Sequence, residues 1–98
     1  MARKKIKRKV PVRNVLGPAL RAIRESLHLS QEDVAARLQR AGWSVDRTVV
    51  TKIEARRRCI TDYELILLGR VLKFSPLEIA SSVKTRDLLA LVHSADLV

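Results

Sequence analysis

Apolar residues recur every three or four positions along most of this chain, with polar residues between them. Leu16, Leu20, Ile23 and Leu27 show this spacing first, and such a set lies along one side of an α-helix. The same spacing returns in three later sets: Val34, Leu38 and Ala41; Val50 and Ile53; and Leu65, Leu68 and Leu72. The pattern predicts amphipathic helices, because strands would alternate apolar and polar residues.

Four of the predicted helices begin with one local signature. An apolar residue precedes a capping residue, and a second apolar residue follows four positions after the cap. The sets are Leu29/Ser30/Val34, Val45/Asp46/Val50, Ile60/Thr61/Leu65 and Phe74/Ser75/Ile79. Glu64 and Glu78 stand at the third helical position, where they would complete capping boxes, and Asp33 is a weaker version of the same.

These signals predict an all-α fold of five short helices that pack into a compact cluster. The ranges are 15–27, 31–41, 47–55, 62–72 and 76–82. Asn14 is the expected cap of the first helix. Residues 85–93 are rich in leucine and are a candidate for a short sixth helix. We expect residues 14–83 to form the domain and residues 84–98 an apolar C-terminal tail.

The charge is concentrated at the beginning of the chain. The net charge is +10, and residues 1–13 hold seven basic residues and no acidic one. Such a segment has little to bury, so we expect a basic arm that is disordered when free. The charge predicts a polyanionic partner, although DNA, RNA and an anionic membrane all satisfy it. A merely solubilising tail is the alternative for the arm.

The remaining composition favours no enzyme and no cofactor. Cys59 is the single cysteine, so an intramolecular disulfide is impossible. His28 and His93 stand far apart without ligand spacing around them, so we expect no metal site. The sequence contains no glycine-rich phosphate loop and no catalytic constellation. It also lacks an apolar run of membrane-span length and the apolar region of a secretory signal, so we expect no membrane partner.

The third predicted helix carries the strongest chemical signal. Its apolar seam is Val50 and Ile53, while its other faces carry Arg47, Thr48, Thr51 and Lys52. It leads directly into three consecutive arginines, Arg56, Arg57 and Arg58. An anchored helix with outward hydrogen-bond donors, next to a basic loop, suits insertion into a groove of DNA.

These residues resemble a known family. The motifs are Leu16-Gly17 with Leu20-Arg21 and Arg24, the run from Leu29 to Ala35, the run from Val50 to Glu54, and Arg57-Arg58. Together they resemble the helix-turn-helix domain of the phage Cro and repressor type, also called the Xre family. The resemblance covers about residues 15–80 and implies a lambda-repressor-like fold of five helices. It also implies a cytoplasmic regulator of transcription that acts as a dimer on palindromic double-stranded DNA.

The resemblance implies roles for individual residues. Gln31 matches the glutamine that binds a backbone phosphate. Arg47, Thr48 and Lys52 match the readers of base edges, and Val49 with Thr48 could contact a thymine methyl group. Thr51, Arg56, Arg57 and Arg58 match backbone contacts. Arg24 and Glu54 match a structural ion pair. The basic arm would add phosphate contacts through Lys4, Lys5, Lys7, Arg8 and Lys9.

The chain departs from the family pattern in its turns. About five additional residues lie between Ala35 and Val45, so we expect a longer second helix and a longer loop at residues 42–44. His28 and Arg56 stand where relatives usually carry a glycine of positive φ, so we expect the ends of the first and third helices to be reshaped or strained.

The function that these observations favour is sequence-specific regulation of transcription, with repression expected. No small-molecule ligand is evident. We expect residues 85–97 to supply part of a homodimer contact or to cover the core of their own chain. Two alternatives stay open: an antitoxin-type or adaptor module that binds a protein, and a nonspecific binder of nucleic acid.

Overall fold

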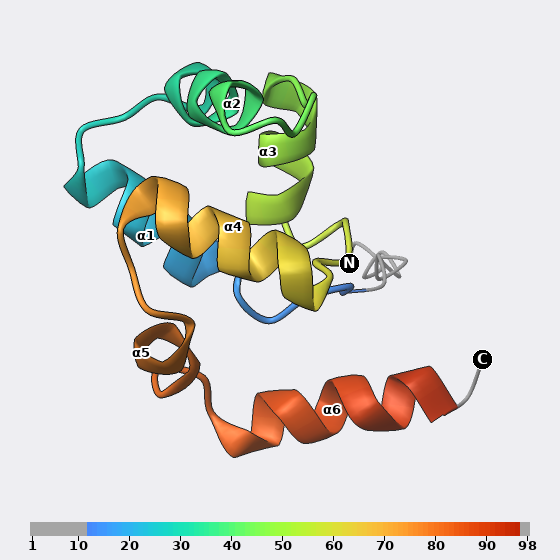
Figure 1. Ribbon diagram of the computed structural model, residues 1–98. Helices are drawn as coiled ribbons and strands as arrows, with labels where there is room; N and C mark the ends of the chain where they lie inside the picture. Colours follow the sequence, from blue (N-terminus) through green and yellow to red (C-terminus); the bar gives the residue numbers. More distant parts are fainter. Residues whose placement is uncertain (1–11, 97–98) are drawn as a thin grey trace, which may run out of the picture.

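The computed structural model describes residues 12–96, and Figure 1 shows that this part of the chain is helical without a strand. The expected all-α fold is confirmed, and residues 85–96 form a sixth helix. The described helices are α1 (Gly17–Ser26), α2 (Gln31–Arg40), α3 (Arg47–Glu54), α4 (Asp62–Leu72), α5 (Pro76–Ala80) and α6 (Thr85–Asp96).

The helices begin where the capping signature placed them. Ser30, Thr61 and Ser75 each accept a hydrogen bond from a backbone N–H of the first turn, in a capping box with Asp33, Glu64 and Glu78 respectively. Asp46 caps α3 by accepting from Val49 N. Three of the four caps are therefore reciprocal, which satisfies two orphan donors at each helix start.

The first helix begins later than the sequence predicted. α1 starts at Gly17 with Pro18 in its first turn, and the position before it is Leu16, whose side chain caps nothing. Asn14 still serves this end, because its Oδ1 accepts hydrogen bonds from Leu16 N at 3.0 Å and Gly17 N at 2.7 Å. The cap thus acts from two residues further upstream than an ordinary N-cap.

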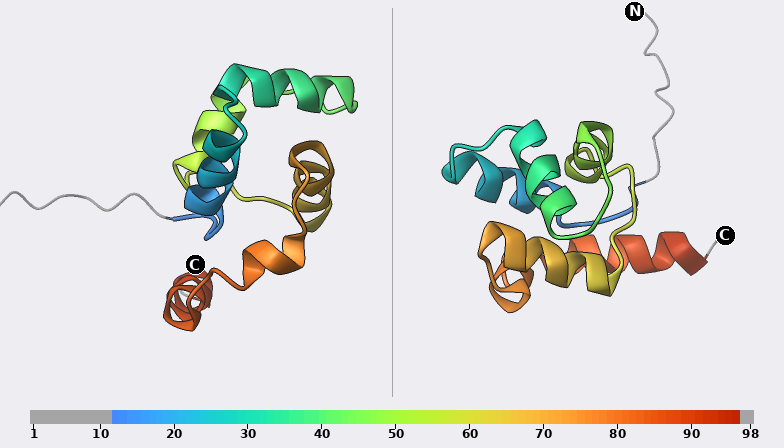
Figure 2. Two further views of the ribbon diagram at one scale, coloured as in Figure 1. Left: turned by 90° about the vertical axis from the view of Figure 1, so that its left-hand side faces the viewer. Right: turned by 45° about the horizontal axis from the view of Figure 1, so that its top comes forward.

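The core is assembled from the apolar seams of α1 to α5. Its buried members are Leu20, Val34, Ala35, Leu38, Val45, Val50, Ile53, Leu68, Leu72 and Ile79. Leu38 of α2 is fully buried, since α2 packs against both α3 and α4. Figures 1 and 2 show α2 lying across α3, with α4 on the other side of the core. This packing fixes α3 by one face only.

The longer turn between α2 and α3 has the form that the sequence predicted. α2 continues to Arg40. Gly42 follows with a φ of +104°, a backbone conformation that would be strained in a residue with a side chain. The loop then folds back, since Trp43 N donates to Leu38 O at 2.9 Å. Val45 returns to the core before α3 begins. The additional residues therefore leave the α2–α3 packing intact.

His28 and Arg56 stand where relatives usually carry glycine, and both have a left-handed backbone. His28 has a φ of 60° and Arg56 a φ of 64°. Lys73 after α4 also has a φ of 63°, and no sequence signal indicated a left-handed residue there. A non-glycine residue in this region costs roughly 1–2 kcal/mol, so all three helix ends carry backbone strain.

α6 lies beside the domain and leaves much of its apolar surface uncovered. Figures 1 and 2 show it extending past α5, away from α1 to α3. Leu88, Leu89 and Val92 are 44 %, 51 % and 53 % exposed. A helix that covered the core of its own chain would bury these residues, so the described geometry does not favour the covering role.

Candidate nucleic-acid interface

α3 presents one face to the core and another to the surrounding solvent. Val50 and Ile53 are buried, while Arg47, Thr48, Thr51 and Lys52 are exposed. The spacing of these four residues, i, i+1, i+4 and i+5, puts their side chains on one side of the helix. Three of the four expected base readers, Arg47, Thr48 and Lys52, therefore share an outward face with Thr51, and Val50 and Ile53 anchor the helix behind it.

The surface between the start of α2 and the outward face of α3 is hollowed. One hollow is lined by Glu32, Asp46, Arg47, Thr48 and Thr51. A neighbouring hollow is lined by Arg24, Ser30, Gln31, Glu32 and Arg47. Arg47 and Glu32 border both, so the N-terminal turns of the two helices form one concave strip that carries charges of both signs.

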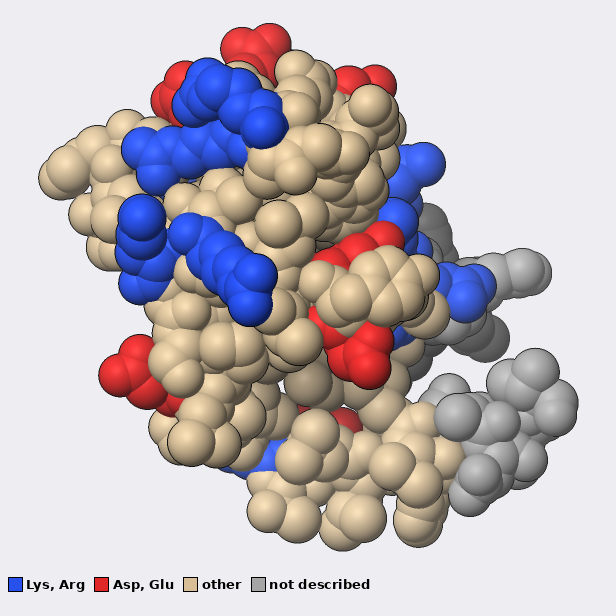
Figure 3. All heavy atoms as spheres, viewed as in Figure 1, with Lys and Arg blue, Asp and Glu red and all other residues tan. Residues whose placement is uncertain are grey.

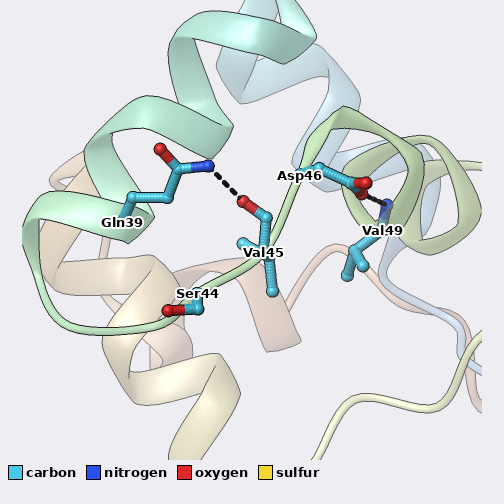
Figure 4. Close-up of a pocket in the computed structure, with 5 residues that line it drawn as sticks. All are labelled: Gln39, Ser44, Val45, Asp46 and Val49. Atoms are coloured by element: carbon cyan, nitrogen blue, oxygen red, sulfur yellow. Dashed lines mark hydrogen bonds between the residues drawn. The ribbon is translucent and has the colours of Figure 1, made fainter.

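A third hollow lies on the other side of α3, where the long loop passes the end of α2 (Figure 4). Gln39 Nε2 donates to Val45 O at 2.6 Å, which ties the loop to the last turn of α2. Val49 is half-buried and its side chain borders this hollow. Of the four expected base readers, Val49 is thus the one that also packs against the core.

Gln31 is held by two neighbours within the protein. Its Nε2 donates to Glu54 Oε1 at 3.0 Å, and its Oε1 accepts from Thr51 Oγ1 at 2.8 Å. A glutamine amide has two N–H donors, and the second has no partner among the described residues. The side chain is therefore oriented by α3 while one donor stays available at the surface of α2.

Glu54 joins this pair to α1. Arg24 donates from Nε to Glu54 Oε2 at 2.6 Å and from Nη2 to Glu54 Oε1 at 3.1 Å. The Arg24 and Glu54 side chains are only 12 % and 7 % exposed. The hydrogen bond to Glu54 raises the pKa of the Arg24 guanidinium. The ion pair that the resemblance implied is thus present, and it extends through Gln31 to Thr51.

The three arginines after α3 have three different environments. Arg57 is exposed and forms no ion pair within the described residues. Arg56 Nε donates to Asn14 O at 3.0 Å. Arg58 holds Glu64 through two hydrogen bonds of 2.9 Å and 3.1 Å, and its guanidinium lies 5.6 Å from the centroid of the Trp43 ring. Only Arg57 leaves its whole guanidinium at the surface.

The Arg58–Glu64 pair changes the ionisation of both side chains. The hydrogen bond from Arg58 is the main cause that holds the pKa of Glu64 below its ordinary value, and the Thr61 backbone adds to it. The same bond raises the pKa of Arg58. The sequence pattern marks Glu64 as a capping residue and gives no sign that Glu64 or Trp43 contacts Arg58. No local pattern links these three, because they meet across two loops.

A second group of cations lies on α2 and α4. Figure 3 shows Lys and Arg side chains gathered on the face that these helices form. Arg37 and Arg40 occupy the last turn of α2, Arg70 the last turn of α4, and Lys73 follows it. Arg37 Nη1 donates to Val71 O at 3.4 Å. Cations at helix C-termini offset the partial negative charge there, which accounts for this group without a ligand.

Some sequence-based expectations lie outside the described residues or concern absences. Lys4, Lys5, Lys7, Arg8 and Lys9 of the basic arm precede residue 12, where the description of the chain begins. Within residues 12–96, no three His, Cys, Asp or Glu side chains group as metal ligands. No helix in that part of the chain combines the length and apolar character that crossing a membrane requires.

Comparison with known proteins agrees with this geometry. A family model described as helix-turn-helix matches residues 20–79, from α1 to α5. No curated protein and no solved structure gives a significant match. The match covers more than half of the chain, and it spans the two helices that form the concave strip. The chain belongs to the helix-turn-helix family of DNA-binding regulators, of the Cro and repressor type that its motifs resemble.

Proposed function

We propose that this protein is a sequence-specific repressor that reads the major groove of double-stranded DNA with α3. The observation that carries the proposal is the division of α3 into a buried seam and an outward face. Arg47, Thr48 and Lys52 are exposed there, and an α-helix of this size fits the major groove. The anchor behind them keeps the helix rigid as it enters.

The proposed base contacts follow from the chemistry of each side chain. Arg47 in the first turn of α3 can donate two hydrogen bonds to guanine O6 and N7. Lys52 lies in the last turn and can reach a second guanine. Thr48 and Val49 offer methyl groups to a thymine methyl. Together these four residues would specify a short half-site.

The proposed backbone contacts lie around this face. Gln31 can give its second amide N–H to a phosphate at the start of α2, where the helix N-terminus also favours an anion. Arg57 can bind a phosphate beyond the end of α3. Thr51 acts mainly by orienting Gln31. We propose a structural role for Arg56 and Arg58 instead of a DNA contact. Arg56 is hydrogen-bonded to Asn14 O, and Arg58 contacts Glu64 and the Trp43 ring.

We also propose that the protein acts as a homodimer joined through α6. The exposed Leu88, Leu89 and Val92 need an apolar partner, and a second copy of α6 supplies one. A two-fold dimer binds two half-sites about one helical turn apart, so its operator would be a palindrome.

Selection of bound sites from a random DNA library tests this function. The result we expect is an enriched palindromic motif whose half-sites lie about 10 base pairs apart, centre to centre. A single enriched half-site would support base reading by α3 and contradict the proposed dimer. Binding without an enriched motif would instead show a nonspecific binder of nucleic acid. An absence of binding would favour a protein-interaction module.

A further inference from the structure

The concave strip between α2 and α3 carries an acidic side chain on a surface that is proposed to approach DNA. Glu32 lies in the first turn of α2 and is exposed. It borders both hollows of the strip, and Arg47 from α3 borders both as well. The acid and the proposed guanine reader therefore share one depression, although they belong to different helices.

Glu32 differs from its neighbours in the first turn of α2, because it has no partner among the described residues. Gln31 is bonded to two side chains of α3. Asp33 forms the reciprocal capping box with Ser30. No cation of residues 12–96 lies within ion-pair distance of Glu32. Its carboxylate is therefore not used to hold the two helices together.

Asp46 is the other acid that borders the strip, and its carboxylate already serves the protein. Its Oδ1 accepts a hydrogen bond from Val49 N at 3.3 Å and so caps α3 (Figure 4). A carboxylate accepts hydrogen bonds and donates none. Glu32 is thus the acid of the strip that can offer both oxygens to a donor on a bound molecule.

A free carboxylate has few favourable partners on the surface of DNA. Phosphate oxygens repel it, and so do the acceptor atoms of guanine and thymine in the major groove. Cytosine presents the donor N4 there without an acceptor beside it, whereas adenine presents its donor N6 beside the acceptor N7. Cytosine is therefore the base that a carboxylate in the major groove fits best.

We propose that Glu32 is a specificity-determining residue that accepts a hydrogen bond from cytosine N4, in a base pair next to the guanine that Arg47 reads. This inference rests on the proposed function and adds a reader from α2 to those of α3. Arg47 and Glu32 form no ion pair with each other, so each can reach its own base pair. The same carboxylate repels phosphates, so it should weaken binding to DNA of other sequences.

A glutamate in a first helical turn also stabilises its helix through the partial positive charge there. That role predicts an effect of Glu32→Gln on stability and none on the choice of bases. Asp62 lies in the first turn of α4, is exposed, and borders neither hollow of the strip. Asp62→Asn is therefore the matched control, because it removes an equal charge from an equivalent part of another helix.

Selection of sites from a random DNA library tests the inference with the unchanged protein, Arg47→Ala, Glu32→Gln and Asp62→Asn. The base pair at which Arg47→Ala relaxes the preference locates the guanine, and we expect a cytosine to be enriched in a neighbouring pair. Glu32→Gln should lose the preference for that cytosine. Adenine should replace it, because a glutamine amide can form two hydrogen bonds with adenine N6 and N7. Asp62→Asn should select the same motif as the unchanged protein.

Binding to single duplexes measures the contribution of Glu32 directly. One probe is the selected duplex, and the other has the assigned cytosine changed to thymine, which presents the acceptor O4 in place of the donor N4. The unchanged protein should prefer the cytosine duplex about five- to hundredfold. Glu32→Ala should bind the two duplexes within about twofold of each other. Its affinity for a duplex of random sequence should rise, since a repulsive charge has been removed.

The possible failures of the inference and of the proposed function are distinguishable. An unchanged motif and unchanged discrimination in the Glu32 variants would overturn the inference and leave base reading by α3 intact. An equal loss of the cytosine preference in Asp62→Asn would show a general effect of charge, and it would also overturn the inference. If the unchanged protein selects no motif at all, the proposed function fails instead.

Discussion

The Glu54 carboxylate binds two side chains, one from α1 and one from α2. It neutralises Arg24 from α1 and, with the same oxygen that Arg24 Nη2 contacts, accepts a hydrogen bond from Gln31 of α2. Each of these partners would be left without its bond if the carboxylate were removed. In a site so little exposed, an unpaired charge costs more than the pair itself contributes.

Glu54→Ala should therefore lower the free energy of unfolding by roughly 2–4 kcal/mol. Arg21→Ala is the matched control, because it removes only an exposed pair with Glu25 and should change stability by less than about 1 kcal/mol. Urea unfolding at pH 7 measures both. Equal stabilities of Glu54→Ala and the unchanged protein would contradict the role of the pair.

Glu64 should make stability depend on pH. Its pKa is lowered in the folded protein, mainly by the hydrogen bond from Arg58. The contribution is therefore complete above the ordinary glutamate pKa, about 4.3, and is lost as pH falls through the lowered value. Glu64→Gln should cost about 1–2 kcal/mol at pH 7. The difference from the unchanged protein should shrink below about pH 4, and a difference that is constant from pH 7 to pH 3 would refute the assignment.

The left-handed residues offer a stabilising substitution. His28 is exposed and its side chain forms no hydrogen bond within the described residues. His28→Gly removes roughly 1–2 kcal/mol of strain but costs about 0.5–1 kcal/mol, because glycine gives the unfolded chain more conformational entropy. The free energy of unfolding should therefore rise by up to about 1.5 kcal/mol. Arg56→Gly is the contrast, since it also loses the bond to Asn14 and should destabilise. Thermal melting of both variants decides, and a lower midpoint for His28→Gly would refute the strain.

Some contacts between single residues can be predicted from the sequence, and others depend on how the loops pack. Arg24 and Glu54 could be paired from the sequence because both belong to recognised motifs. Arg58 and Glu64 could not, since their contact needs the loop after α3 to turn toward α4. Asn14 was expected to cap α1, but its bonds to Ile53 O in α3 and Arg58 O in the following loop depend on packing between segments that lie about 40 residues apart.

At the scale of helices, neighbouring residues predicted where helices start more accurately than where they end. The caps at Ser30, Asp46, Thr61 and Ser75 need only neighbouring residues, and all four are confirmed. The expected helix ends were one or two residues too long at α1, α2, α3 and α5. Helix ends depend on how the next segment leaves the core, and the left-handed residues after α1, α3 and α4 are His28, Arg56 and Lys73 rather than glycine.

The apolar side chains of α6 are only partly covered by the rest of the chain. Its leucines lie on a helix that the core does not cover. A chain that ends at Lys84 should keep the fold of α1 to α5 and sediment as a monomer, whereas the full chain should sediment as a dimer. Circular dichroism checks the fold of the shorter chain. If both chains are monomers at high concentration, α6 is not a dimer contact.

At the scale of the whole molecule, the surfaces proposed to contact DNA converge on the concave side of α2 and α3. The start of α2 and the outward face of α3 border the concave strip, and Arg57 is exposed beyond the end of α3. The cations at the ends of α2 and α4 form a separate group. Affinity and sequence preference should therefore respond to different residues, with preference confined to α3.

Substitution of Arg47 tests this division most directly. Sites are selected from a random DNA library with the unchanged protein, with Arg47→Ala and with Arg57→Ala. If α3 reads the major groove, Arg47→Ala should weaken binding to the preferred site by on the order of 1–3 kcal/mol and relax the preference at one base pair. Arg57→Ala should weaken all sequences alike and leave the motif unchanged. If Arg47→Ala selects the same motif with the same preference as the unchanged protein, α3 is not the reading helix.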